Sequence, residues 1–262
     1  MELMFSQLVA LLSALWWPFC RTLAMLSAAP VVGEAMVPPA PRVLLALVLA
    51  VVLLPAAQPA VAIDAFSLRG VAATIEQALI GFGLGLAFHL TMAVVTVLGY
   101  MVSSQMGLSM ALMNDPMNGS SSDVVSSLLY MLSILVFFAI DGHLVLTGVL
   151  GSSFKAWPVG NAGIPLATLQ GLALNVAWVF SAALLLALPV IFSTGVVQLG
   201  FGFLNRIAPS LNLFSLGFSV VTLFGLFVLS QMVRFIPEHY VRMSERVLQM
   251  LHQSLQVGGP HG

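Results

Sequence analysis

Histidines are the side chains of this sequence best suited to bind a metal or to move a proton at neutral pH. They stand at positions 89, 143, 239, 252 and 261, and no two have the helical spacing of a metal-binding pair. His89 lies within an apolar segment, so it is either a buried neutral imidazole with a hydrogen-bond partner or part of a proton relay. We predict no catalytic residue, no metal site and no cofactor.

Other ionisable side chains fall at places where their charge needs an explanation. Arg21 and Glu76 lie within apolar segments, which makes them functional candidates unless each pairs with another helix or subunit. The sequence Asp141–His143 closes an apolar helix, and Gly142 is suited to end it. Cys20 is the single cysteine, so no intrachain disulfide forms.

The composition indicates an integral membrane protein. Of the 262 residues, 60% are hydrophobic and only 6% are charged, whereas soluble domains carry about 25% charged residues. The formal net charge is -1 and no basic patch is visible, which argues against nucleic-acid binding. The sequence also lacks the phosphate-binding pattern G-x-x-x-x-G-K-[ST], so no P-loop nucleotide site is expected.

Hydropathy predicts an all-α, polytopic protein with about six hydrophobic helices. The first segment lacks the basic start of a signal peptide and is expected to be retained. The second and fourth segments are short for a membrane span, which needs about 20 apolar residues. The segments are Leu3–Leu26, Val43–Ala57, Val71–Leu98, Val124–Ile140, Leu166–Leu199 and Leu211–Ile236.

Three regions are expected along the chain. Residues 1–236 form the helical domain, residues 237–255 form an amphipathic helix, and residues 256–262 form a disordered tail. If all six segments span the membrane, the distribution of Lys and Arg puts both termini in the cytoplasm.

Methionines recur in the polar stretch "SSQMGLSMALMNDPMNGSSSD", which begins at Ser103. Met106, Met110 and Met113 share one helical face, and Asn114-Asp115-Pro116 marks a turn. This methionine face either fills a protein core or forms a deformable seal, because methionine adapts to irregular surfaces. The loop is too polar to face lipid.

Two further features lie within apolar runs. Gly81, Gly83 and Gly85 allow helices to approach closely or permit a kink. The stretch "GFLNRIAPSLNLFSLGF", from Gly202 to Phe218, breaks a helix at Pro209, and its polar side chains can satisfy the freed carbonyl groups.

These motifs together resemble the FliR-type family of type III secretion export-gate subunits. The resemblance runs nearly end to end, through "FCRTLAMLSAAPVVGEAMVPPAPR", "IGFGLGLAF", "QMGLSMALMNDPMNG", "LVFFAIDGHLVL" and the last stretch above. The family pattern R-x-x-P-x-x-N-x-F-x-x-G-F is met by Arg206, Pro209, Asn212, Phe214, Gly217 and Phe218. Ser210 and Ser219 depart from the Gln and Pro that many relatives carry.

The resemblance implies a fold of bent helical hairpins that assembles with FliP-like and FliQ-like subunits into a funnel-shaped gate. Part of this gate stands above the bacterial inner membrane on the periplasmic side, at the flagellar basal body, and a FlhB-like switch protein is a further partner. The R-x-x-P motif becomes a subunit-packing turn. The loop becomes a plug that closes the channel for unfolded flagellar proteins. Its residues are Met106, Gly107, Leu108, Met110, Leu112, Met113, Asn114, Asp115 and Pro116.

Two rival functions remain open at this stage. The first is the same subunit in a virulence injectisome, with a different cargo. The second is a small-solute secondary transporter, which often shows an inverted repeat and charged sites at the membrane midplane. Neither of these two features is clear in the sequence.

Overall fold

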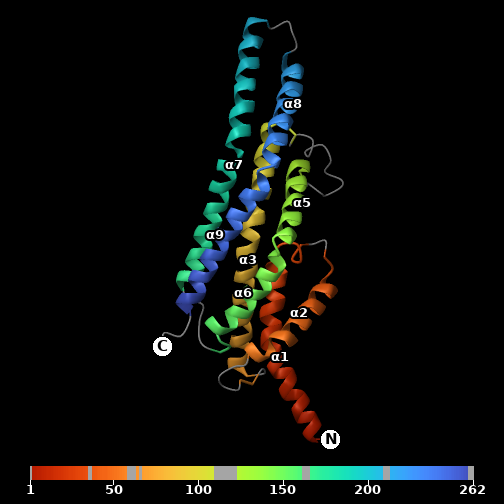
Figure 1. Cartoon of the computed structure of the whole chain (residues 1–262), viewed down its shortest axis with the longest axis vertical. Coiled ribbons are helices and arrows are strands. Elements are labelled where there is room, and N and C mark those ends of the chain that lie inside the picture. Colours follow the sequence, from red (N-terminus) through yellow and green to blue (C-terminus); the bar gives the residue numbers. More distant parts are fainter. Residues whose placement is uncertain are drawn as a thin grey trace. The chain divides into compact units, whose positions relative to one another are not determined.

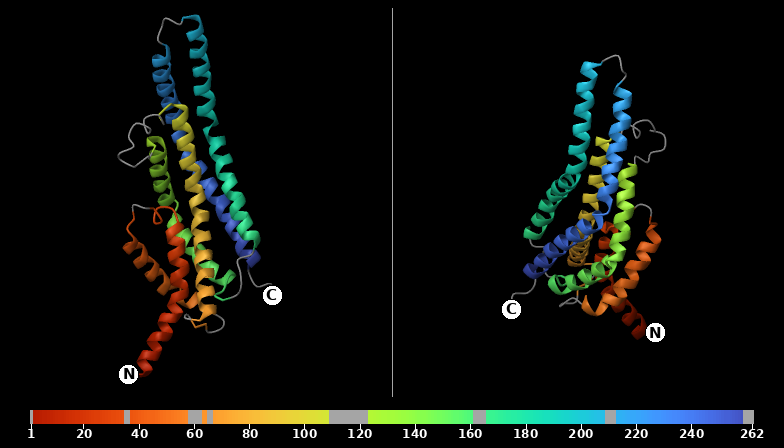
Figure 2. Two further views of the ribbon diagram at one scale, coloured as in Figure 1. Left: turned by 180° about the vertical axis from the view of Figure 1, so that it is seen from behind. Right: turned by 45° about the horizontal axis from the view of Figure 1, so that its top comes forward.

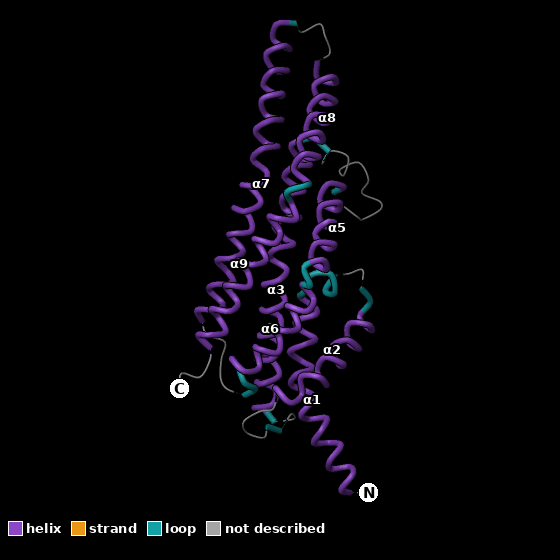
Figure 3. The backbone as a smooth tube through the Cα atoms, in the orientation of Figure 1, coloured by secondary structure: helices purple, strands orange, loops and turns teal. Residues whose placement is uncertain are grey.

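The structure is a computed structural model that describes residues 2–34, 37–57, 63–64, 67–108, 123–160, 166–208 and 213–258. Within these ranges the regular structure is entirely helical (Figure 3). Its elements are α1 (Glu2–Ala28), α2 (Pro39–Leu53), the 3₁₀ helix η1 (Leu54–Ala56), α3 (Leu68–Gln105), α5 (Val124–Ala139), α6 (Gly142–Ala156), α7 (Leu166–Ile207), α8 (Leu213–Val233) and α9 (Ile236–Gly258).

Four helical stretches among the described residues are long and apolar enough to cross a membrane, and α5 with α6 makes up to five. The four are Pro39–Ala56, Leu68–Gln105, Ala173–Ile207 and Leu216–Val233. The expected all-α, polytopic membrane protein is therefore confirmed. The short second segment reaches span length because η1 continues α2.

The helices α3 and α7 are much longer than a membrane span. With 38 and 42 residues and a rise of 1.5 Å per residue, they extend over about 57 Å and 63 Å. The hydrocarbon core of a bilayer is only about 30 Å thick. Each of these helices is therefore about twice as long as an upright membrane span needs.

The junction after α5 differs from the sequence prediction. Gly142 was expected to end this helix, but α5 ends at Ala139 and Gly142 instead begins α6. The left-handed conformation is taken by Asp141, with φ of 55°, because a short polar side chain tolerates this region. One apolar run thus gives two helices.

The chain, whose helices are labelled in Figure 1, divides into two compact units. Unit 1 comprises Met1–Leu90, Asp141–Asn175 and Ser244–Gly262, and unit 2 comprises Thr91–Ile140 and Val176–Met243. The helices α3, α7 and α9 each contribute residues to both units.

Unit 1 is built around close contact between α1 and α3. A Cβ atom added at Gly81 would lie 2.0 Å from the carbonyl oxygen of Arg21, and one at Gly85 would lie 2.3 Å from that of Met25. Only glycine allows two helix backbones to come this near. Gly83, half-buried, lies between these two positions in sequence, on another side of the helix.

The proline-rich break between α1 and α2 is held by an arginine. Arg42, in the first turns of α2, donates hydrogen bonds to the carbonyl oxygens of Val32, Glu34 and Val37 at 2.9, 3.1 and 3.3 Å. Val31 in the same turn has a φ of 68°, a costly conformation for a β-branched residue. The guanidinium satisfies carbonyl groups that the broken helix cannot.

In unit 2, α8 and the later part of α7 form a helical hairpin. These two helices lie side by side in every view (Figures 1 and 2). Large apolar side chains cover its outside, including Phe192 at 75%, Phe203 at 67% and Leu223 at 68% exposure. A soluble protein rarely exposes such a surface, so it faces lipid or other protein.

The last helix, α9, is amphipathic. Its buried residues recur at helical spacing and are Ile236, Tyr240, Met243, Val247, Leu251 and Leu255. Glu238 in the first turn pairs with Arg242 at 2.6 Å on the exposed side. The helix runs to Gly258, beyond the predicted end at residue 255, and residues 259–262 lie outside the described residues.

Candidate functional site

The predicted plug segment begins at the end of α3, where the structure anchors it to α8. The Met106 side chain is 1% exposed, and a Cβ atom added at Gly225 would lie 2.7 Å from it, so the methionine fills the space left by that glycine. The carbonyl of Met106 accepts a hydrogen bond of 2.9 Å from the Thr222 hydroxyl. Met106 is therefore an anchor of the segment within a packed core.

Gly107 turns the chain away from α3. Its φ of +74° is a conformation that favours glycine, and a Cβ atom there would lie 2.6 Å from the Phe218 ring. Phe218, from the predicted subunit-packing turn, thus lies against the start of the predicted plug. Leu108 follows and is half-buried.

The other end of the segment is anchored at Asp123, which is 6% exposed. One carboxylate oxygen accepts a hydrogen bond from the Ser103 hydroxyl of α3. The other accepts from the Ser126 backbone N–H at 3.0 Å and the Ser126 hydroxyl at 2.9 Å. Asp123 is thus the N-cap of α5, and it joins α5 to α3.

A glycine of α3, Gly99, allows α3 and α5 to approach each other closely at this junction. A Cβ atom at Gly99 would lie 2.4 Å from the Cα of Ser126, and the Ser126 hydroxyl also donates to the Thr96 carbonyl at 3.2 Å. The residues on both sides of 109–122 are therefore attached to the last turns of α3, and the first side is also held by α8. We call Ser103, Met106, Asp123 and Thr222 the stem anchors.

Several predicted residues lie outside the described residues. Of the plug, these are Met110, Leu112, Met113, Asn114, Asp115 and Pro116. Of the subunit-packing turn, Pro209 and Asn212 also lie outside, as does the side chain of Phe214. Their predicted roles therefore remain predictions.

The described part of the subunit-packing turn is open to the surroundings. Arg206 lies in the last turn of α7 and is exposed, and Phe218 on α8 is 49% exposed. Gly217 is buried, and a Cβ atom there would lie 3.4 Å from the Phe201 ring. Gly217 therefore joins the two helices of the hairpin, whereas Arg206 is available to contact another chain.

The roles of Ser103, Asp123 and Thr222 were not predicted from the sequence. A signal for Asp123 was present, because an Asp directly before an apolar run is a typical helix start. The contacts of Ser103 and Thr222 join positions far apart in sequence, and no local pattern announces them. Within the described ranges, no group of three or more His, Cys, Asp or Glu side chains could hold a metal ion.

The stem anchors give a testable expectation. Asp123→Ala leaves the Ser126 N–H without its cap, at a cost of about 1 kcal/mol, and leaves the Ser103 hydroxyl without its acceptor. We expect a lower midpoint of thermal unfolding for the purified protein with Asp123→Ala, and a smaller decrease with Ser103→Ala. Ser104→Ala, at the exposed neighbouring position, is the matched control.

A double mutant separates this bond from general damage. If Ser103 and Asp123 act through one hydrogen bond, the double variant loses less stability than the two single losses added together. Strict additivity, or a control as unstable as the variants, would contradict the assignment of this bond.

Comparison with known proteins shows the family of this chain. The family model described as "Bacterial export proteins, family 1" matches residues 12–247. The chain belongs to this family. It is 34% identical over 239 residues to the flagellar biosynthetic protein FliR of Pectobacterium carotovorum subsp. carotovorum, covering 91% of each chain. It is 32% identical over 248 residues to FliR of Escherichia coli (strain K12), covering 94% of each.

A third similar protein has a name that does not refer to flagella. The surface presentation of antigens protein SpaR of Salmonella typhimurium (strain LT2) is 25% identical over 190 residues, covering 71% of each chain. The flagellar relatives match more of the chain at higher identity. The resemblance read from the motifs is confirmed.

Proposed function

We propose that this chain is a core subunit of the flagellar type III export gate in the bacterial inner membrane. The single observation that carries the proposal is the similarity to flagellar FliR proteins over nine-tenths of both chains. The apolar, membrane-length helices agree with this role. The subunit would help to form the channel through which unfolded flagellar proteins leave the cytoplasm, and it would act without catalysis of its own.

The partners in this proposal are FliP-like and FliQ-like subunits and a FlhB-like switch protein. The exposed apolar outside of the α7–α8 hairpin supports such an assembly, because lipid or protein has to cover it. Exposed Arg206 at the end of α7 offers a charge-assisted hydrogen bond to a neighbouring subunit. Co-purification of FliP-like and FliQ-like chains with a tagged copy tests the assembly.

The flagellar and injectisome functions differ in cargo. A strain that lacks its own flagellar gate subunit should swim again when it carries this chain. Export of injectisome effectors without restored swimming would favour the second function, which is the one that the match to SpaR suggests.

The plug role is part of the same proposal. The physical support is that both ends of residues 109–122 are attached to α3 and α8 by buried contacts. Methionine and leucine side chains pack against one another to exclude water, and they repack around an unfolded polypeptide of any sequence. Such a seal blocks ions and admits protein.

Replacement of residues 109–120 by a short Gly-Ser linker tests this role, because it leaves Leu108 and Asp123 in place. We expect the complex to assemble and the ion conductance of resting cells to rise. A linker inserted after Gly160, in another loop, is the control. A variant that assembles and stays as tight as the parent would show that this segment does not close the channel.

A further inference from the structure

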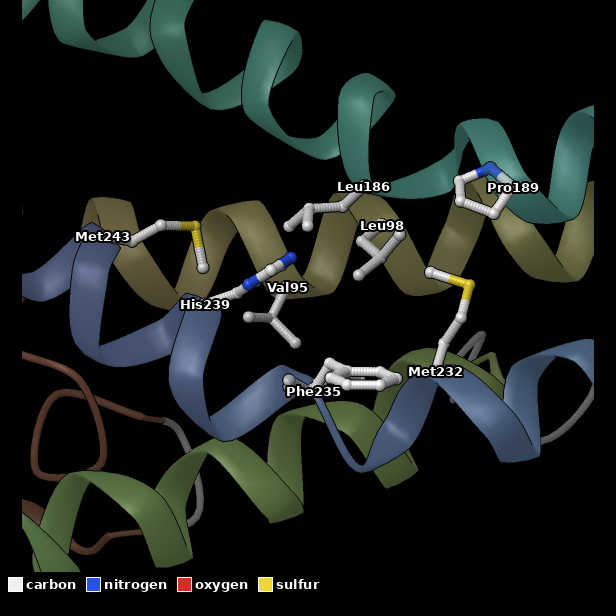
Figure 4. A pocket seen from close by; sticks show the side chains of 9 residues that line it. Val95, Leu98, Leu186, Pro189, Met232, Phe235, His239 and Met243 are labelled. Carbon is white, nitrogen blue, oxygen red and sulfur yellow. The ribbon is translucent and has the colours of Figure 1, made fainter.

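We propose that a pocket within unit 2 holds an acyl chain of an anionic phospholipid. The pocket lies between α3, α7 and the junction of α8 with α9 (Figure 4). It is lined by Val95, Leu98, Leu186, Pro189, Met232, Phe235, Ile236, His239 and Met243.

The pocket has a buried floor and an open mouth. Val95 and Leu98 of α3 form the floor, with exposures of 1% and 2%. Phe235 stands at the mouth and is 53% exposed. Apart from the His239 imidazole, the lining side chains carry only carbon and sulfur, so the favoured occupant is apolar.

The size of the pocket limits the class of occupant. Its volume is about 290 Å³, at the small end of ligand sites. An α-helix with its side chains is about 10 Å across and does not fit, whereas a stretch of acyl chain does. Met232 and Met243 in the wall can adjust to a flexible chain.

The position along the chain indicates a boundary between lipid and water. The membrane-length stretch of α8 ends at Val233, and the charged, amphipathic α9 starts three residues later at Ile236. The mouth of the pocket lies at this change from apolar to charged helix. Acyl chains and headgroups meet at such a level.

The charge at the mouth selects the kind of lipid. The Arg234 guanidinium lies 5.5 Å from the centre of the Phe235 ring. Glu238 nearby in sequence is paired with Arg242, so this pair adds no net charge. Arg234 therefore gives the mouth a positive charge, and basic pockets between membrane helices favour anionic headgroups.

Lipid carried by the purified gate complex provides the first test. Native mass spectrometry should detect bound phosphatidylglycerol in the parent complex. Leu186→Trp fills the pocket and should remove this lipid, whereas Leu188→Trp should retain it. Leu188 is on the same helix, is 46% exposed and does not line the pocket.

A second measurement does not depend on filling the pocket. Phe235→Trp places a fluorophore at the mouth, and phospholipids with brominated acyl chains should quench it beyond the background of the four native tryptophans. With Arg234→Gln added, the preference for phosphatidylglycerol over phosphatidylethanolamine should fall about fivefold, as expected for about 1 kcal/mol per cation.

Three results would overturn the proposal. One is a parent complex without bound phospholipid. Another is equal lipid loss from Leu186→Trp and Leu188→Trp. The third is an unquenched Phe235→Trp in the assembled complex, which would show that no acyl chain lies at the mouth of the pocket.

Discussion

Gly81→Ala is expected to prevent recovery of a stable complex. The new methyl carbon would lie 2.0 Å from the Arg21 carbonyl oxygen and 3.1 Å from the Ala24 Cβ. Ordinary contact begins at 3.4 Å, and both obstacles belong to α1 rather than to the end of a flexible side chain. The two helices therefore have to separate, and overpacking of this kind costs about 1–3 kcal/mol.

The measurement is the amount of assembled complex on native gels after mild extraction. Gly148→Ala is the matched control, because it also adds a methyl group to a helical glycine of unit 1 and has open space around it. Alanine in an open helical position stabilises by up to about 1 kcal/mol. If Gly81→Ala assembles as well as Gly148→Ala, the close approach of α1 and α3 is wrong.

Composition and periodicity predict the parts of the fold that depend on local sequence. The apolar runs became helices, and the proline-rich stretch from Ala29 to Arg42 became the break between α1 and α2. Apolar residues recurring at near-helical spacing predicted the amphipathic character of α9. In each case the signal lies within a few turns of the element that it forms.

The positions of helix ends within apolar runs were less predictable. The fourth apolar segment was predicted to end at Ile140, next to the observed end of α5 at Ala139. The helix α6, which starts directly afterwards at Gly142, was not predicted. The structure ends α5 at Ala139 because Asp141 takes a left-handed conformation. The adjacent Gly142 was predicted to end α5, but it begins the next helix, α6.

In the candidate site, too, local sequence predicted which stretch of chain is involved but not its tertiary contacts. The motif around Met106 marked the right stretch of chain, yet the spacing of methionines could not show that Met106 would be buried against Gly225 of α8. That contact joins residues more than a hundred positions apart. Similarly, Arg21 could be recognised as needing a partner, but which helix supplies the partner depends on the tertiary fold.

Arg21 joins three segments of unit 1. Its side chain is fully buried and donates hydrogen bonds to the Gln77 amide oxygen of α3 at 2.8 Å, the Ser153 hydroxyl of α6 at 3.1 Å and the Trp157 carbonyl at 2.7 Å. The guanidinium lies 4.1 Å from the centre of the Phe154 ring. Of the readings open for this residue, pairing with other helices is the one observed.

Arg21→Leu is therefore expected to destabilise the complex strongly. It leaves three buried acceptors without their donor, and each unsatisfied group costs about 1–3 kcal/mol. Arg21→Lys should be intermediate, because an ammonium group keeps the charge but cannot reproduce the planar fork of donors. The readout is the midpoint of thermal dissociation of the purified complex. Lys155→Leu, which removes an exposed cation from α6, is the control and should match the parent.

A compensating variant distinguishes lost hydrogen bonds from lost volume. Replacement of a whole buried polar group by apolar side chains is often neutral, whereas removal of one partner is costly. Arg21→Leu combined with Gln77→Leu should therefore recover part of the stability that Arg21→Leu loses, because one stranded acceptor is gone. If the double variant is less stable than Arg21→Leu, Arg21 stabilises unit 1 by filling space, and its hydrogen bonds to α3 and α6 contribute little.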